Sequence, residues 1–154
     1  MPRGQSRKAA AKKKPRPAQK GDAARRHADR IRKALLEARP AGLHTPQLMR
    51  ACALTRSQVA AGIAMLRDQA AEKHWPPLVW TREGSYCFCG DPHELRRYEI
   101  RVTSEYLTEM RRLHSGTVAP HVELHPTDRF GNYLITQVSA LETTLDLIVH
   151  YAPQ

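Results

Sequence analysis

Three cysteines and eight histidines are the side chains of this sequence that are best suited to bind a metal ion. Cys87 and Cys89 are separated by one residue, His93 follows them, and Cys52 lies far away in the sequence. Zinc sites usually leave about two to four residues between paired cysteines, and strand alternation would put Cys87 and Cys89 on one face. We therefore interpret them as small core or surface residues and expect no bound metal. Redox sensing by Cys87 and Cys89 stays open, because it depends on a lowered thiol pKa.

The sequence patterns that carry catalysis in other proteins are missing. His121 and His125 are spaced like two ligands on a helix, but Pro126 follows at once and no glutamate-bearing zinc-protease motif surrounds them. The glycines are isolated, so the sequence has no phosphate-binding loop and no dinucleotide fingerprint. There is no Gly-x-Ser-x-Gly motif for a nucleophile. We expect a protein that is not an enzyme and that carries no cofactor.

Most of the positive charge lies at the N-terminus. The formal net charge is +10, and residues 1–21 hold eight lysines and arginines and no acid, among them Lys12, Lys13, Lys14 and Arg16. Three prolines and few apolar residues predict a disordered polybasic arm. Such arms bind phosphate backbones by releasing counterions, without reading the base sequence. A solubilising tail and a membrane-surface patch are the alternatives.

Length and composition limit the remaining classes. The 154 residues fit one ordinary domain, or a small domain with an appendage, and 41% are hydrophobic, which is enough for a core. No apolar run reaches the roughly 18 residues of a membrane-spanning helix, and no apolar stretch follows the basic N-terminus as in a secretory signal. Three cysteines are too few for a disulfide scaffold. We expect a cytoplasmic, nucleoid-associated protein and no membrane partner.

Hydrophobic spacing predicts three helices in the first half of the chain. The first would start at Asp22 as the N-cap and end near Arg39. The second would cover about 46–53, with Thr45 as the capping residue and Pro46 in the first helical position. The third would start at Thr55, which forms a capping box with the glutamine three residues later. Its predicted apolar stripe consists of Val59, Ile63, Leu66 and Ala70.

A β-hairpin is predicted directly after the third helix. Residues 78–81 and 85–88 are short β-prone runs, and Arg82-Glu83-Gly84 forms the turn between them. Helix, short helix, turn, helix is the order that a helix-turn-helix requires, and a basic hairpin after the recognition helix is a wing. The segment from about 25 to 89 therefore resembles the winged helix-turn-helix DNA-binding domain. The stretches LHTPQLMRACALTRSQVAAGIAMLRD and PLVWTREGSYCF carry this resemblance.

A second resemblance covers the whole chain. The chain is similar to the small RacP-type proteins of actinobacterial plasmids and chromosomes, whose TGTVAP-like segment corresponds here to Ser115–Pro120. This resemblance implies a regulatory DNA-binding role.

The winged-helix resemblance implies which side chains would contact DNA. The third helix would enter the major groove with its N-terminal turns first. Ser57 and Gln58 would meet base edges, and Ala61 would offer a methyl contact to thymine. Further contacts to bases or phosphates are implied for Arg56, Arg67, Arg82 in the wing, and Thr45 and Arg50 in the second helix. Ala64 and Asp68 leave few groups for reading bases, so a protein-binding winged helix is the alternative.

The last third of the chain predicts a helical dimerisation element. Asp91-Pro92 is a capped start for a helix to about residue 114, whose apolar stripe includes Val102 and Tyr106. Gly116 is expected to break this helix, and Thr127 or Asp128 to cap a last helix to about residue 151. A heptad-like seam on the last helix consists of Leu134, Val138, Leu141, Leu145 and Ile148. A homodimer is our expectation; a helical hairpin within a monomer and a surface for another protein are the alternatives.

Together these patterns predict a mainly α protein with a small β-hairpin, in which a winged helix-turn-helix precedes a two-helix C-terminal extension. The expected division is a basic arm at 1–21, the winged helix at 22–90 and the helical extension at 91–154. The expected function is that of a DNA-binding transcriptional regulator that binds double-stranded DNA as a homodimer. The alternative is an architectural or adaptor protein whose winged helix binds a protein partner.

Overall fold

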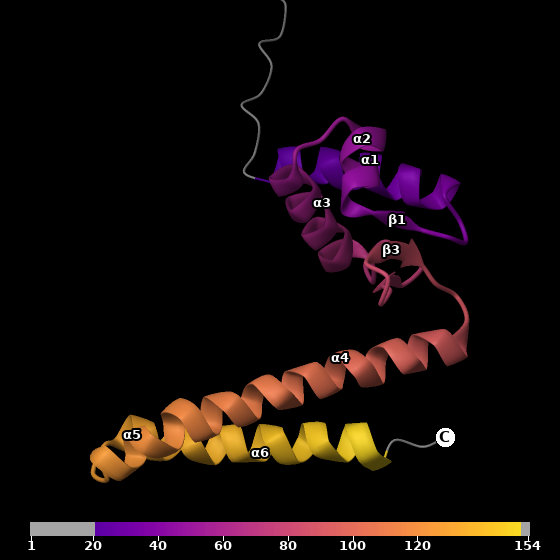
Figure 1. Cartoon of the computed structure of the whole chain (residues 1–154). Helices are drawn as coiled ribbons and strands as arrows, with labels where there is room; N and C mark the ends of the chain where they lie inside the picture. Colours follow the sequence, from indigo (N-terminus) through magenta and orange to yellow (C-terminus); the bar gives the residue numbers. More distant parts are fainter. Residues whose placement is uncertain (1–20, 152–154) are drawn as a thin grey trace, which may run out of the picture.

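The computed structural model describes residues 21–151. These residues are mainly helical and include a small three-stranded antiparallel sheet. Figure 1 shows two parts: a body of three helices and the sheet, and a long antiparallel helical hairpin beneath it. The predicted polybasic arm, with Lys12, Lys13, Lys14 and Arg16, lies outside the described residues except for Gly21.

Helix α1 (Asp22–Glu37) forms one wall of the body. Its residues Ala28, Ile31 and Leu35 recur at helical spacing and are buried. The prediction that Asp22 is the N-cap was wrong: Gly21 takes that position in a left-handed conformation, and Asp22 is the first helical residue. Its carboxylate there suits the positive end of the helix dipole.

Helices α2 (Thr45–Cys52) and α3 (Arg56–Gln69) follow, joined by a short turn. Ala53 ends α2 in the left-handed region, with a φ of 49°. The prediction that Thr45 caps α2 was wrong by one residue. His44 is the N-cap, and the Gln47 side-chain oxygen accepts a hydrogen bond of 2.8 Å from its backbone N–H. The predicted Thr55–Gln58 capping box of α3 is confirmed.

Helix α3 packs very closely on α1. Val59, Ile63 and Leu66 are buried as predicted, whereas Ala70 lies beyond the end of α3 and is half-buried. Gly62 is buried at the crossing point: a Cβ there would lie 2.6 Å from Ile31 Cδ1 and 3.1 Å from the backbone carbonyl carbon of His27. The missing side chain at Gly62 therefore sets how near the two helices come.

The sheet contains the predicted hairpin and one strand more. Strands β2 (Leu78–Trp80) and β3 (Ser85–Phe88) pair antiparallel, and Gly84 occupies the turn with a φ of 86°. The prediction of a two-stranded hairpin was incomplete, because β1 (Leu43–His44), between α1 and α2, pairs with β3 on its other side. Gly42, with a φ of 75°, precedes β1, and a Cβ on it would collide with the Tyr86 carbonyl oxygen.

One hydrophobic core holds the three helices and the sheet together. Its largest fully buried side chains include Ile31 and Leu35 of α1, Leu48 of α2 and Leu66 of α3. Phe88 of β3 joins the same cluster, and Trp75 packs against its edge. Leu78 of β2 also belongs to the cluster, and Leu43 of β1 packs against it, so side chains from all three strands fix the sheet against the helices.

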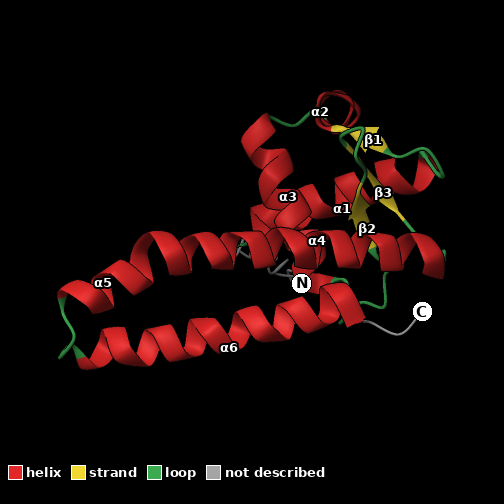
Figure 2. Ribbon diagram, turned by 60° about the horizontal axis from the view of Figure 1, so that its bottom comes forward, coloured by secondary structure: helices red, strands yellow, loops and turns green. Residues whose placement is uncertain are grey.

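The helical hairpin consists of α4 (Pro92–Leu113), a π-helical turn η1 (His114–Val118), α5 (Ala119–Leu124) and α6 (Arg129–Tyr151). Figure 2 shows α6 running back antiparallel to α4. Asp91 caps α4 as predicted, by accepting a hydrogen bond of 3.1 Å from the His93 N–H. At the start of α6, the Asp128 carboxylate accepts one of 2.7 Å from the Gly131 N–H.

The prediction that Gly116 breaks the helix after residue 114 was wrong. Helical structure continues through η1 into α5, and the turn of direction comes only after Leu124. A single glycine inside a helix costs only about 1 kcal/mol. Val118, two residues later, is 1% exposed, and its burial offsets that cost.

Candidate nucleic-acid interface

The N-terminal end of α3 is open to solvent. Arg56 and Ser57 are exposed, and so are Ala61, Ala64 and Asp68 along the same side of the helix. Ser57, Ala61, Ala64 and Asp68 lie opposite the buried stripe that begins at Val59, as the helical period requires, and Arg56 lies on its flank. The exposed side of the leading turns of α3 is therefore not covered by the core of the body.

Hydrogen bonds hold this end of α3 in one conformation. The Thr55 hydroxyl accepts a bond of 3.3 Å from the Gln58 N–H, and the Gln58 side-chain oxygen accepts one of 2.9 Å from the Thr55 N–H. The hydroxyl oxygens of Thr55 and Ser57 are 3.1 Å apart, and one of the two hydroxyls donates a hydrogen bond to the other. The Gln58 amide oxygen already accepts one hydrogen bond, whereas both amide N–H groups remain as donors for a base.

The predicted contact residues on α3 do not all lie together. Arg67 belongs to the last turn, eleven residues after Arg56, which corresponds to about 16 Å along the helix. Its guanidinium lies over the Tyr86 ring, with its central carbon 5.9 Å from the ring centre. Arg67 therefore faces the sheet and α4 rather than the leading end of α3.

Helix α2 adds one exposed cation to this side of the body. Arg50 is exposed, and its Nε donates a hydrogen bond of 3.4 Å to the Pro46 carbonyl. Thr45 is half-buried in the first turn of α2. The sequence analysis did not single out Arg30, an exposed residue of α1 near the end of α2: burial raises the pKa of the Cys52 thiol there, and the charge of Arg30 partly opposes that rise. Its position on the polar side of α1 was the available signal.

The β2–β3 turn carries charges of both signs. Arg82 and Glu83 are both exposed there. The pKa of Glu83 is lowered, first by a hydrogen bond with the backbone and then by one with the Thr81 side chain. Glu83 is therefore ionised at neutral pH, and its charge offsets that of Arg82 at the tip of the turn.

The seam predicted for dimerisation is divided between the inside and the outside of the hairpin. Val138 of α6 is 3% exposed, Leu107 of α4 and Val118 of η1 are also buried, and both α4 and η1 contact α6. Three further members, Leu134, Leu145 and Val102, are half-buried. The other three remain open, with exposures of 62% for Tyr106, 51% for Leu141 and 44% for Ile148.

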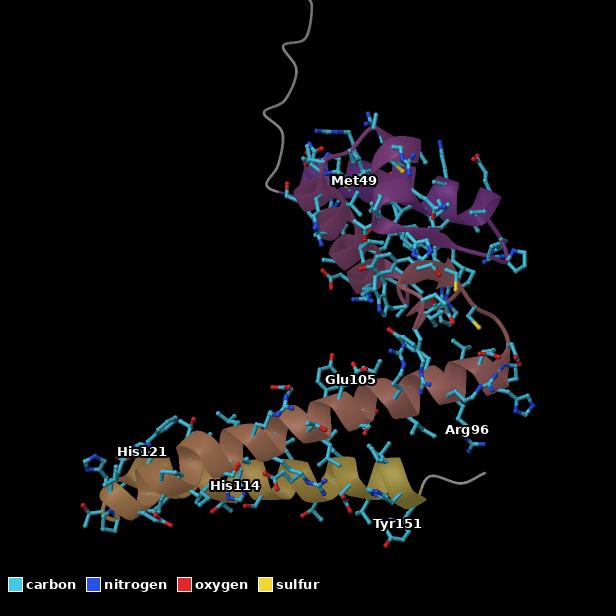
Figure 3. All side chains as sticks on the ribbon, in the orientation of Figure 1. Met49, Arg96, Glu105, His114, His121 and Tyr151 are labelled. Carbon is cyan, nitrogen blue, oxygen red and sulfur yellow. The ribbon has the colours of Figure 1, made fainter. Side chains whose placement is uncertain are left out.

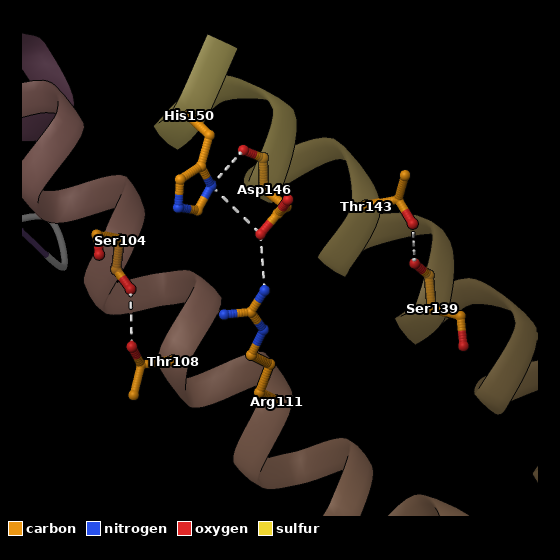
Figure 4. Close-up of polar contacts among 7 residues, drawn as sticks. All are labelled: Ser104, Thr108, Arg111, Ser139, Thr143, Asp146 and His150. Atoms are coloured by element: carbon orange, nitrogen blue, oxygen red, sulfur yellow. Dashed lines mark hydrogen bonds and ion pairs between the residues drawn. The ribbon is translucent and has the colours of Figure 1, made fainter. Parts of the chain in front are cut away.

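Polar contacts also join α4 and η1 to α6. Arg111 donates to Asp146 at 2.7 Å, and His114 Nδ1 lies 2.9 Å from the Glu142 carboxylate. Figure 4 shows the first of these contacts, with His150 beside Asp146. Such polar contacts contribute little, only about 0–1 kcal/mol for an exposed pair such as Arg111 and Asp146. They fix the register of α6 against α4, while apolar packing supplies most of the stability of the hairpin.

Cys52 and Cys87 lack the lowered pKa of reactive thiols. Burial raises the pKa of Cys52 and of Cys87, and the nearby Cys89 raises that of Cys87 further. A raised pKa keeps a thiol protonated and slow to react. Within residues 21–151, no three His, Cys, Asp or Glu side chains gather so that they could hold a metal ion.

Comparison with protein-family models, with curated proteins and with solved structures finds no match to this chain. Among the helices of the described part, none combines the length and the apolar character needed to cross a membrane.

Proposed function

We propose that the chain is a transcriptional regulator that binds double-stranded DNA as a homodimer, in the cytoplasm and on the nucleoid. The observation that carries this proposal is the open, rigidly capped N-terminal end of α3. Arg56 and Ser57 are exposed there, and no element of the described chain covers them. A helix end of this kind can enter the major groove, where base edges offer hydrogen-bond acceptors and methyl groups.

The order of the elements supports a winged helix-turn-helix. Helix, short strand, two helices and a hairpin, with the first strand pairing on the hairpin, is the arrangement of that domain. In this arrangement α3 is the recognition helix and the β2–β3 turn is the wing. Arg82 would then contact a phosphate or the minor groove, and Arg50 a phosphate beside α2.

The basic arm would supply affinity that is independent of sequence. Residues 1–21 hold eight cations and no acid. Phosphate contacts by such a segment strengthen binding to all DNA alike and weaken it as salt rises. The leading turns of α3 would supply the preference among sequences.

The outside of the hairpin supports dimerisation. Leu107 of α4 and Val138 of α6 are buried and mark the line along which the two helices touch. Around the axis of α6, Leu141 and Ile148 lie about 60–80° away from Val138, both in the same direction. Because the helices are antiparallel, residues of α4 that are rotated in the same sense away from Leu107 lie on the same side of the hairpin. We call this side the outer apolar face; its exposed members are Tyr106, Leu113, Phe130, Leu141 and Ile148.

A second copy of the chain is the partner that we propose for the outer apolar face. Two hairpins that pair through it would form a four-helix bundle, a common solution for burying such faces. A two-fold axis through the bundle would present two α3 helices to two half-sites on one side of the duplex.

An adaptor function is the second candidate. The open side of α3 carries Ala61, Ala64 and Asp68, which leaves few groups for reading bases. In that case the body would bind another protein and the arm alone would hold nucleic acid.

Capture of sheared genomic DNA by the full chain, followed by sequencing, separates the two candidates. A regulator is expected to enrich a short motif with two-fold symmetry. Uniform recovery of all fragments, at an affinity that depends on salt alone, would contradict sequence-specific binding and favour the adaptor.

A further inference from the structure

A recess lies between the body and α4. It has a volume of about 530 Å³ and opens to solvent between the end of α3, the sheet and the middle of α4. We name it the interdomain recess. Three charged and three aromatic side chains that line it carry the argument below: Arg67, Arg101, Glu105, Trp80, Tyr86 and Tyr98. Figure 3 shows Glu105 on the side of α4 that faces the body.

The charges of the interdomain recess do not balance. Arg101 bonds to the Trp80 carbonyl oxygen and lies 3.5 Å from the Glu105 carboxylate. Arg67, by contrast, has no carboxylate within ion-pair distance among the described residues, and its guanidinium only covers the Tyr86 ring. Two guanidinium groups thus meet one carboxylate, which leaves a net positive charge beside the ring of Tyr86.

The arrangement of the guanidinium groups favours an anion with two oxygens. The guanidinium carbon of Arg67 lies 5.9 Å from the centre of the Tyr86 ring, and the group has no ion-pair partner among the described residues, so the N–H groups on its edge remain free. Arg67 keeps all five of these donors available in this way. A carboxylate is the ligand that matches such an edge, because it accepts two parallel hydrogen bonds.

Aromatic rings form the walls next to this charge. The rings of Trp80 and Tyr86 have their centres 4.5 Å apart and their planes at an angle of 59°. The central guanidinium carbon of Arg101 lies 5.3 Å from the centre of the Tyr98 ring. Rings of this kind prefer flat aromatic partners, with which they stack or pack edge to face. Ligand sites usually combine such walls with one or two charged groups that orient the ligand.

We propose that the interdomain recess binds a planar aromatic carboxylate and that this ligand regulates DNA binding. Its carboxylate pairs with Arg67, and its ring packs among Trp80, Tyr86 and Tyr98. The regulatory half of the proposal rests on the proposed function. Arg67 belongs to α3 and Tyr98 to α4, so a bound ligand contacts the proposed DNA-reading helix and the proposed dimer-forming hairpin together. A ligand that favours one arrangement of these two parts shifts the affinity for DNA.

Calorimetric titration of the full chain with 2-naphthoate, without DNA, tests the site itself. The neutral 2-naphthamide has the same ring system and serves as the matched ligand. Saturable binding of 2-naphthoate, at least tenfold tighter than that of 2-naphthamide, is expected. Equal affinities, or no saturable binding by about 10 mM naphthoate, would overturn the site.

Arg67→Met tests the assignment of the charge. Methionine keeps an unbranched chain over the Tyr86 ring and removes the guanidinium, and Arg67 holds no described ion pair whose loss could unfold the chain. The variant is expected to bind 2-naphthoate at least tenfold more weakly and to bind 2-naphthamide unchanged. Arg112→Met, on an exposed part of α4 outside the recess, is the control and should behave as the parent chain. Parent-like affinity in Arg67→Met would overturn the proposed pairing.

Titration of a DNA duplex with the chain, with and without saturating 2-naphthoate, tests the regulation. An at least threefold change in DNA affinity is expected in the parent chain but not in Arg67→Met, and DNA must change the naphthoate affinity by the same factor. Naphthoate binding without any change in DNA affinity would overturn the regulatory half alone. Naphthoate binding by a chain that binds no DNA would contradict the proposed function and leave the site standing.

Discussion

Thr55 and Gln58 satisfy each other's backbone N–H groups at the start of α3, with hydrogen bonds of 2.9 and 3.3 Å. This reciprocal pair fixes the leading turn of the helix that we propose to read DNA. It also means that Gln58 has a structural role in addition to any contact with a base.

Gln58→Glu separates these two roles. Glutamate also completes a capping box, so the melting temperature should stay within about 2 °C of the parent. The amide donor is lost and a negative charge faces the phosphates, so binding to the enriched DNA motif should weaken about tenfold. Thermal melting and fluorescence anisotropy measure the two effects. Gln137→Glu makes the same charge change on an exposed site of α6 and should leave DNA binding unaltered. Equal DNA affinity of the two variants would contradict a contact by α3.

Arg56→Gln tests the exposed cation beside this capping box. Loss of one phosphate contact should weaken binding several-fold for all sequences and reduce the slope of log affinity against log salt by about 1. Anisotropy titrations at four or five salt concentrations give that slope. Arg112→Gln removes an exposed charge from α4 and is the control. A slope unchanged in Arg56→Gln would place Arg56 away from the phosphates.

Deletion of residues 1–20 tests the basic arm while keeping the Gly21 cap of α1. Affinity should fall equally for motif and random DNA, and the salt slope should fall by up to about 7, because eight cations are removed. Competition between motif and random duplexes checks that the preference for the motif survives. Loss of the preference together with the affinity would mean that α3 does not read DNA.

Leu141→Asp combined with Ile148→Asp tests the outer apolar face. Both side chains are exposed, so the folded hairpin tolerates the change, whereas two buried charges in a dimer interface are costly. Light scattering should report monomers, with the helical circular dichroism signal unchanged. Thr143→Asp, which places a charge on an exposed residue of α6 away from that face, should leave the dimer intact. A dimer that survives the double substitution would exclude this face as the interface.

Two glycine substitutions should change stability in opposite directions. Gly42→Ala should lower the melting temperature, because the backbone has a φ of 75° and the added Cβ would meet the Tyr86 carbonyl and the Cys87 Cβ. Gly116→Ala should raise stability by about 0.5–1 kcal/mol, because Gly116 is helical and nothing lies near its Cβ position. Denaturant titration measures both. A destabilising Gly116→Ala would indicate that the π-helical turn needs glycine.

Local features of the fold followed directly from the sequence. The capping box at Thr55, the Asp91 cap and the β2–β3 hairpin each depend on residues only a few positions apart, and all three are present. Strand β1 was missed because its two residues pair with β3, more than forty positions away. A strand so short has no periodicity of its own, and only its partner defines it.

The candidate site was predictable only in part. The apolar period on α6 identified a buried side correctly at Val138, but it could not tell which residues α4 would cover. Leu141 and Ile148 lie on the flank of that contact line, so two of the five residues of the predicted seam on α6 remain exposed. The interdomain recess was not predictable, because its residues come from α3, the sheet and α4, and only tertiary packing brings them together.

Gly62 joins α1 and α3 with almost no space between their backbones. Small-residue crossings of this kind leave little room for one helix to slide on the other. Any reorientation of α3, the helix that we propose to read DNA, must therefore carry α1 with it, and the basic segment is attached to the start of α1. Sequence-independent attraction and base recognition would consequently be delivered by one rigid unit, so that the position of one on the duplex determines the position of the other.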